Sequence, residues 1–268
     1  MSIPYALDDA QIAFANAQDD GMTDVNTIIS TVRTLLVTTL GWSEPSTALF
    51  KTPVDAASRF LDVLLTRISA TNLEIRVRNA TPTTVITRRI QITSGGSVWY
   101  HGNIFGLVIA SLSATNEIAQ AHVLDQTPDL QSDSALYVVA NAYRSAADSA
   151  DGNGTIMGQY FAIDNGAAGM LSRLRRWTAS GNSNGGSTVN SQFQTITGKL
   201  LWRDALAAIN SAGTLRWAGR ICHALMCDST LALLARRYPY IDTSTGKEFM
   251  VLGLTSVQNM KIAFRSDN

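Results

Sequence analysis

Residues 72–79 read NLEIRVRN, and their apolar and charged side chains alternate strictly. Side chains along a strand point to opposite faces in turn. Leu73, Ile75 and Val77 would therefore share one face of an extended chain, with Glu74 and the two arginines on the other. A period of two over eight residues predicts a β-strand with one buried face.

Further β-prone segments lie on both sides of this stretch. Residues 85–92 read VITRRIQI, and the connector NATPTT at 79–84 has turn chemistry, so the two runs predict a hairpin. Short apolar segments separated by Gly, Ser or Asn continue the pattern at 60–68 and 97–112 and on to the C-terminus. Such spacing predicts a mainly β fold of the β-sandwich or jelly-roll-like type. Residues 199–209, KLLWRDALAAI, fit a helix and a strand equally well.

An amphipathic helix is predicted near the N-terminus, over residues 24–40. Its apolar side chains recur at intervals of three and four residues: Val25, Ile28, Ile29, Val32, Leu35, Leu36 and Leu40. The opposite face is polar but almost uncharged, which is unusual for a face that meets water. Because β-branched residues lower helix propensity, a strand is the alternative.

The sequence patterns divide the chain into three parts. Residues 1–41 form an N-terminal helical segment, 42–150 a β-sandwich region, and 151–268 a second β-rich region that belongs either to the same domain or to a second one. The division rests on a Gly/Asn-rich break at 151–158.

Charge is sparse and balanced. Lys and Arg together number 21, Asp and Glu together number 21, and 16% of residues are charged, against roughly 25% in typical soluble domains. Nucleic-acid binding depends largely on phosphate neutralisation by a basic excess, so we expect no nucleic-acid partner. A neutral chain also lacks the self-repulsion that keeps monomers apart, which favours packing against neighbours.

No targeting or membrane segment is apparent. The first residues lack a basic stretch followed by an apolar one, and no uncharged apolar run reaches the 18 or more residues that a membrane helix needs. We therefore expect synthesis in the cytoplasm and no membrane insertion.

Candidate metal sites have simpler explanations. Cys222 and Cys227 flank His223, but positions five apart point to opposite faces of a strand, and no second cluster completes four ligands. The acidic stretch around 148–160 resembles a calcium loop, yet Ser149 and Tyr160 fall where ligands are required. We expect neither a metal nor a cofactor.

Catalytic motifs are equally weak. The three histidines, His101, His122 and His223, stand in no recognisable nucleophile motif, and no GxSxG sequence is present. We expect no enzymatic activity, although a pair of carboxylates for glycoside cleavage could come from distant parts of the chain.

Aromatic residues supply the candidate ligand platform. Trp99, Tyr100 and His101 are consecutive and could stack on sugar rings, or they could simply be core residues. The Gly/Ser/Asn-rich loop at 178–188 is a second candidate for presenting a ligand.

Four sequence segments, taken in order, resemble a known class of proteins. They are LVTTLGW at 36–42, SRFLDVLLTRISATNLEIRVRN at 58–79, TRRIQI at 87–92, and RRYPYIDTSTGKEFMVLGL at 236–254, which predicts a terminal hairpin. This succession resembles small β-sandwich structural proteins of tailed-bacteriophage virions. Within that class it is similar to tail, baseplate or fibre-associated components more than to the major capsid protein.

The resemblance implies a virion component without catalytic activity, present in many copies. Its partners would be itself and other virion proteins, through symmetric contacts. We expect the predicted helix to supply the interface, with Ile28, Val32, Leu35 and Trp42 as candidate contact residues. The alternatives are a module for host attachment that binds a host-surface glycan and, third, a polysaccharide hydrolase.

Overall fold

The computed structural model of the chain describes residues 11–53, 60–78, 84–115, 118–125, 138–144, 161–164, 171–174, 203–211, 214–228, 237–243, 246–253 and 260–267. Strands dominate these residues, so the prediction of a mainly β chain is confirmed. The described strands form two sheets, and all of their pairings are antiparallel.

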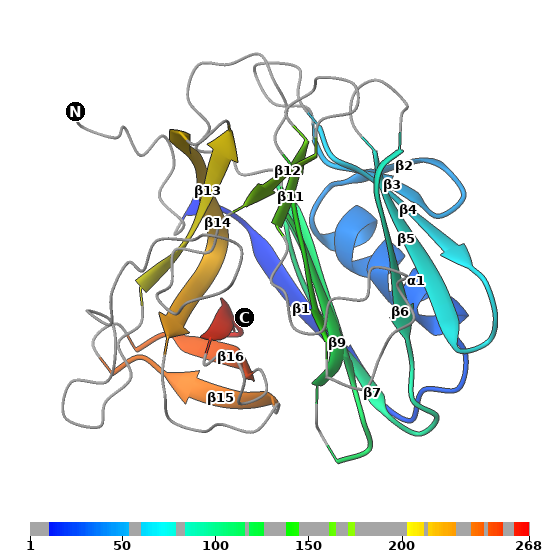
Figure 1. Cartoon of the computed structure of the whole chain (residues 1–268). Coiled ribbons are helices and arrows are strands. Elements are labelled where there is room, and N and C mark those ends of the chain that lie inside the picture. Colours follow the sequence, from blue (N-terminus) through cyan, green and yellow to red (C-terminus); the bar gives the residue numbers. More distant parts are fainter. Residues whose placement is uncertain are drawn as a thin grey trace.

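The smaller sheet has five strands in sequence order (Figure 1). Its members are β2 Ser43–Ser46, β3 Leu49–Lys51, β4 Asp62–Arg67, β5 Asn72–Arg78 and β6 Thr84–Gln91. Strands β5 and β6 form the hairpin predicted from residues 72–92. Leu73, Ile75 and Val77 are fully buried. The alternation in NLEIRVRN therefore marks the core face correctly.

The larger sheet has twelve strands. From one edge to the other, its order is β1 Phe14–Asp19, β7 Ser97–Asn103, β8 Gly106–Leu112, β9 Ile118–Asp125, β10 Val138–Arg144, β11 Phe161–Asp164, β12 Leu171–Leu174, β13 Arg203–Ser211, β14 Thr214–Asp228, β17 Met260–Arg265, β16 Glu248–Gly253 and β15 Arg237–Ile241. Strands β15 and β16 pair as the terminal hairpin predicted from 236–254. The segment 199–209 fits a helix and a strand equally well by sequence, and its described part, from residue 203 on, is extended in β13.

Strand β1 corrects the assignment of residues 1–41 as a helical segment, because Phe14–Asp19 are extended and pair with β7. The physical reason is that alternate side chains of this six-residue run pack on opposite faces of the sheet, as the side chains of a strand do. Ala15 and Ala17 pack against the main core, while Phe14 contacts rings on the opposite face of the sheet.

Two helical stretches follow β1 along the chain. The α-helix α1 covers Asn26–Arg33, and a π-helical stretch, η2, covers Thr34–Thr39. At the start, the Asp24 carboxylate accepts the backbone N–H of Asn26 at 2.8 Å. At the end, Gly41 adopts a φ of 74°, a conformation that suits glycine after a helix.

The helical stretches lie between the five-stranded sheet and the first strands of the larger sheet (Figure 1). One hydrophobic core joins all three. Its fully buried members include Ile28, Val32, Leu36, Phe50, Ile75, Tyr100 and Ile109. The helical residues therefore contribute to the body of the fold.

The contact with β7 depends on Gly102. A Cβ at this position would lie 2.8 Å from Leu40 Cδ1, 3.1 Å from Leu36 Cδ2 and 3.3 Å from Leu35 Cδ2. The absence of a side chain lets the helical stretch lie directly on the strand.

We predict that Ile28→Ala lowers the free energy of unfolding by about 2–5 kcal/mol, because it removes a fully buried side chain from a packed core. The exposed Asn26→Ala on the same helix is the control, with an expected change of about 0.5 kcal/mol or less. Chemical denaturation measures both. Equal, small changes in the two variants would show that Ile28 is not a core residue.

Candidate functional site

The four candidate interface residues lie in the chain's own core. Ile28 and Val32 are 0% exposed, Leu35 is 4% exposed, and Trp42 is 2% exposed with its indole N–H donating to the carbonyl of Asn103 at 2.9 Å. The prediction that they contact a neighbour is therefore corrected. The apolar stripe of the helix is satisfied within the molecule, so an interface on this segment must use its other face.

The candidate ligand platform is also internal. Trp99, Tyr100 and His101 are 3%, 0% and 1% exposed, so they offer no surface to a sugar ring. Because successive residues of β7 point to opposite faces, Tyr100 belongs to the main core and the other two face away from it. The loop at 178–188 and the acidic stretch at 148–160 lie outside the described residues.

Tyr100 and Thr31 share one acceptor. The tyrosine hydroxyl donates to Asp19 Oδ2 at 2.8 Å, and the threonine hydroxyl donates to the same oxygen at 2.7 Å. Burial, together with the hydrogen bond to the Asp19 carboxylate, raises the pKa of Tyr100 above its ordinary value. This carboxylate links β1, β7 and α1.

On the opposite face of β7, five rings from four strands form a cluster in which four rings are buried and Phe14 is partly exposed. Phe14 of β1 lies 4.6 Å from His223 of β14 between ring centroids, and His101 lies 5.4 Å from Phe264 of β17. Trp99 completes the set, at 6.2 Å from His101. This ring cluster (Phe14, Trp99, His101, His223, Phe264) joins the first strands of the large sheet to its C-terminal strands.

Both histidines of the ring cluster are held by polar partners. Nε2 of His223 donates to the carbonyl of Ile12 at 2.8 Å, and Nδ1 of His101 lies 3.0 Å from Asn16 Oδ1. His223 has a φ of 56°, which is uncommon for a residue with a side chain. The backbone of β14 also shifts register with β13 between Asp204 and Leu206.

The protonation of His101 is strongly disfavoured. Burial lowers the pKa of His101 to about 3, and the neighbouring His223 contributes to this decrease. A hydrogen bond with the backbone of Arg265 raises the pKa and so offsets part of the decrease. The guanidinium of Arg265 also lies over the Phe14 ring, 4.9 Å from its centroid. His101 is thus a neutral core residue at neutral pH.

Metal ligands do not converge in the described part of the chain: no group of three His, Cys, Asp or Glu side chains there could hold an ion. Cys222 is buried. Among the same residues, neither helical stretch is long and apolar enough to cross a membrane.

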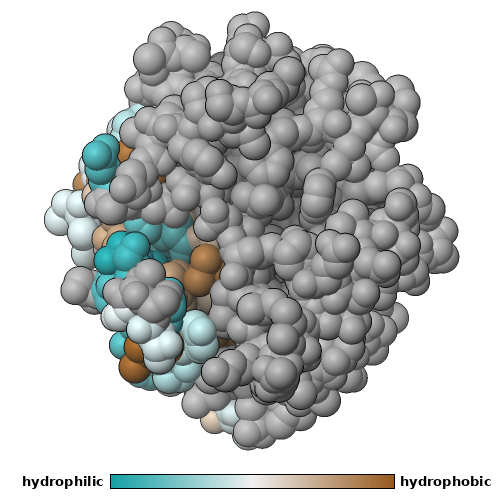
Figure 2. Space-filling view, turned by 90° about the vertical axis from the view of Figure 1, so that its left-hand side faces the viewer, coloured by the Kyte–Doolittle hydropathy of each residue, from teal (hydrophilic) through white to brown (hydrophobic). Residues whose placement is uncertain are grey.

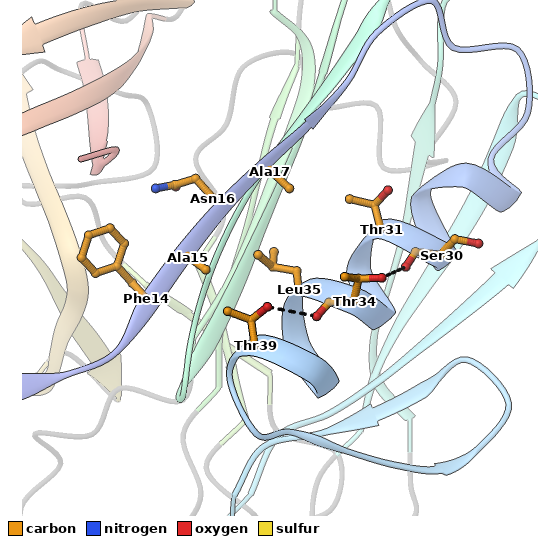
Figure 3. Close-up of a pocket in the computed structure, with 9 residues that line it drawn as sticks. All are labelled: Phe14, Ala15, Asn16, Ala17, Ser30, Thr31, Thr34, Leu35 and Thr39. Atoms are coloured by element: carbon orange, nitrogen blue, oxygen red, sulfur yellow. Dashed lines mark hydrogen bonds between the residues drawn. The ribbon is translucent and has the colours of Figure 1, made fainter. Parts of the chain in front are cut away.

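The surface feature nearest the N-terminal elements is an open groove of about 630 Å³ between β1 and the helical stretches (Figure 3). Its lining residues are Phe14, Ala15, Asn16, Ala17, Ser30, Thr31, Thr34, Leu35 and Thr39. None of them carries a charge. Figure 3 shows Ala15 and Ala17 directed from β1 toward the helix, which faces them with hydroxyl groups.

Two of these hydroxyl groups bond to the helix backbone. Thr34 Oγ1 donates to the carbonyl of Ser30 at 3.2 Å, and Thr39 Oγ1 donates to the carbonyl of Thr34 at 3.3 Å. The threonine methyl groups and the two alanines then give the groove a wall that is largely apolar and carries no formal charge.

The groove continues onto an exposed helical surface that we call the hydroxyl face. It consists of Thr27, Ser30, Thr34, Thr38 and Thr39, all exposed. Arg33 is the one charged residue in the stretch 25–40. Its guanidinium forms a two-point ion pair with Glu44 of β2, at 2.7 and 2.9 Å, which lowers the pKa of the Glu44 carboxyl.

The face that carries the C-terminal strands has a different character. On the part of it that the structure describes, hydrophobic residues form separate spots among hydrophilic ones (Figure 2). Two large hydrophobic residues are exposed among the described ones. Ile241 is the last residue of β15, whereas Ile68 lies between β4 and β5 of the smaller sheet.

Comparison with models of known protein families and with curated proteins gives no match for this chain. Sequence reasoning missed the groove because β1, which supplies one of its walls, lies within the residues 1–41 that were assigned to a helical segment. The uncharged polar face of residues 24–40 was the signal that pointed toward it.

We predict that acidification destabilises the fold through His101. The histidine is neutral when folded, with a pKa of about 3, and has an ordinary pKa of 6.5 when unfolded. Between these two pKa values the unfolded state binds a proton at His101 and the folded state does not. The contribution of neutral His101 to the free energy of unfolding is therefore fully present above pH 6.5 and is lost progressively as the pH falls toward 3. The loss should be on the order of 1–2 kcal/mol between about pH 7 and about pH 5.

Urea unfolding of the wild type and of His101→Phe across this range measures the effect. The variant keeps a ring in the cluster and removes the titrating group, so its stability should fall less on acidification than that of the wild type. Parallel pH profiles would show that His101 is not the group responsible.

Proposed function

We propose that this chain is a structural subunit of a multi-copy assembly, and that the assembly is a tailed-phage virion, with the chain in its tail, baseplate or fibre-associated parts. In this proposal the two sheets and the enclosed helical stretch form a β-sandwich body, and the subunit has no catalytic role. Its partners are further copies of itself and other virion proteins.

The hydroxyl face is the observation that carries the assembly role. Removing neutral hydroxyl groups from water costs far less than removing charges, and the cores of protein interfaces are depleted of charged residues. The one charge in the segment is already paired with Glu44. A second molecule can therefore approach this face without burying an unpaired ion.

The overall charge supports the same role. With 21 basic and 21 acidic residues, the formal net charge is zero. Long-range repulsion between copies is then weak at neutral pH, which favours a high local density of subunits. The virion identity of the particle rests on the resemblance of the segments at 36–42, 58–79, 87–92 and 236–254.

The alternatives receive less support from the described residues. A host-glycan module loses its predicted platform, because Trp99, Tyr100 and His101 are buried. The polysaccharide hydrolase would require an acidic cleft, and the lining of the described groove contains neither Asp nor Glu.

We predict that the purified chain forms species heavier than 28.8 kDa, and that Thr27→Glu/Thr38→Glu shifts them toward the monomer. Both positions lie on the hydroxyl face, so the double variant places two unpaired charges in the contact. Light scattering across a concentration series measures the masses, and negative-stain imaging shows whether particles form.

The control is Thr47→Glu/Thr243→Glu, which adds the same charge at two exposed positions in turns outside the helical stretches. It should assemble as the wild type does. A wild-type monomer at every concentration would contradict the assembly role. Equal effects of the two double variants would show that the hydroxyl face is not the contact surface of the assembly.

A further inference from the structure

The C-terminal strands contain a small core that is distinct from the main one. We call β13, β14, β15, β16 and β17 the C-terminal unit, and the helical stretches, the five-stranded sheet and β1, β7, β8 and β9 the N-terminal body. The small core of the unit consists of Phe249, Val251 and Ala263, with Leu225 and Tyr240 packed against them. The buried members of the main core lie within residues 22–124. Each part therefore has apolar packing of its own.

The described connections between the two parts include one backbone pair and the ring cluster. Strands β12 and β13 pair at a single position, Leu174 with Ile209. In the ring cluster, three rings come from β1 and β7 of the body, and two come from β14 and β17 of the unit. Figure 1 shows β13, β14, β15 and β16 on one side of β1, and the helical stretches with the five-stranded sheet on the other. Local opening of a protein commonly follows such boundaries between packed units.

Two histidines face each other across this boundary. His101 belongs to β7 of the body and His223 to β14 of the unit, and their rings meet edge-on with centroids 6.2 Å apart. The two residues are 1% and 3% exposed. Protonation of both would place two like charges, removed from water, on opposite sides of the contact that joins the parts.

The charged groups at the ring cluster do not offset such a change. Both imidazoles contact the Phe14 ring, at 5.7 and 4.6 Å between centroids, and the guanidinium of Arg265 lies over the same ring. Arg265 forms a two-point ion pair with Asp267, at 2.9 and 3.0 Å, which lowers the pKa of that carboxyl below its ordinary value of 3.8. Asp267 therefore stays ionised at about pH 5. The other rings of the cluster, Trp99 and Phe264, carry no charge.

We propose that the ring cluster is an acid-sensitive latch, in which protonation of His101 and His223 releases the C-terminal unit from an N-terminal body that stays folded. Protonation of buried histidines at a contact between two packed units is a common way to make that contact depend on pH. The latch is independent of the proposed assembly role.

The direction of the effect follows from the two environments of His101. Its pKa is about 3 in the closed latch and returns to the ordinary 6.5 once the ring is in water. Between these values the released form binds a proton that the closed form does not, so a falling pH favours release. For His101 alone, the equilibrium constant for release should rise roughly 25-fold between about pH 7 and about pH 5.

The N-terminal body contains ion pairs that persist over the same range. Arg33 lowers the pKa of the Glu44 carboxyl, and Arg67 lowers the pKa of the Asp24 carboxyl. Their ordinary values are 4.5 and 3.8, so both carboxyls stay ionised at about pH 5. The main core lies on the face of β7 that carries Tyr100, opposite to His101. We therefore expect the body to keep its fold when the latch opens.

Hydrogen exchange of the full-length wild type at pH 7 and pH 5, analysed by mass spectrometry and corrected for the intrinsic effect of pH on exchange, tests the latch. Protection factors in β14, β16 and β17 should fall at least about tenfold at pH 5, whereas those in α1, β4 and β5 should change less than about twofold. Equal falls in both parts would show that acid unfolds the chain as a whole. That result, or unchanged factors in the C-terminal strands, would overturn the latch.

The double variant His101→Phe/His223→Asn tests the role of the two histidines. Asparagine tolerates the positive φ of position 223 better than most residues, and its amide keeps a hydrogen-bond donor there. Protection in the C-terminal unit should then change less than about twofold between the two pH values. A fall as large as that of the wild type would overturn the assignment to these histidines.

The matched control is Trp99→Phe, which weakens packing in the same cluster and leaves both histidines in place. It should lower protection in the C-terminal unit at both pH values and keep the fall on acidification. Loss of the pH dependence in this control would show that the packing of the cluster, and not histidine protonation, sets the response, and would overturn the proposal. The comparison of the two parts in the wild type requires no variant, so it decides the matter even where a substitution prevents folding.

Discussion

The close approach of the helical stretch to β7 is the constraint on which the rest of the structure depends. It requires a residue without a side chain at position 102, since a Cβ there would lie within 2.8–3.3 Å of three leucine methyl groups. At this depth, Ile28, Val32 and Leu36 reach the shared core between the sheets. The hydroxyl face is then left outside, and the groove beside β1 forms where the helix and the two alanines of the strand face each other.

The sequence predicts the parts of this arrangement that depend on local periodicity. The alternation in residues 72–79 is sufficient for β5 because every second side chain enters the same core, and turn residues fix the hairpin with β6. The terminal hairpin follows for the same reason. The groove and the ring cluster do not follow, because they join residues from elements far apart in the chain, and no local pattern encodes which strands become neighbours.

The two corrections to the candidate site residues have one origin. An apolar stripe on a helix shows that the stripe is buried, but it does not show whether the covering surface belongs to the same molecule or to another. Ile28, Val32, Leu35 and Trp42 are covered from within. Trp99 and His101 illustrate the same limit on a strand, where both faces of β7 prove to be internal and the aromatic residues serve packing.

Strand β1 is held from both faces of the sheet, and its contacts join the N-terminal elements to the C-terminal strands. Ala15 and Ala17 pack toward the helix and main core, while Phe14 and Asn16 engage the two buried histidines on the other side. One edge of β1 is bonded to β7. A strand near the start of the described chain is thus fixed by residues from β7, from β14 and from the helical stretch, and no local sequence pattern specifies such contacts.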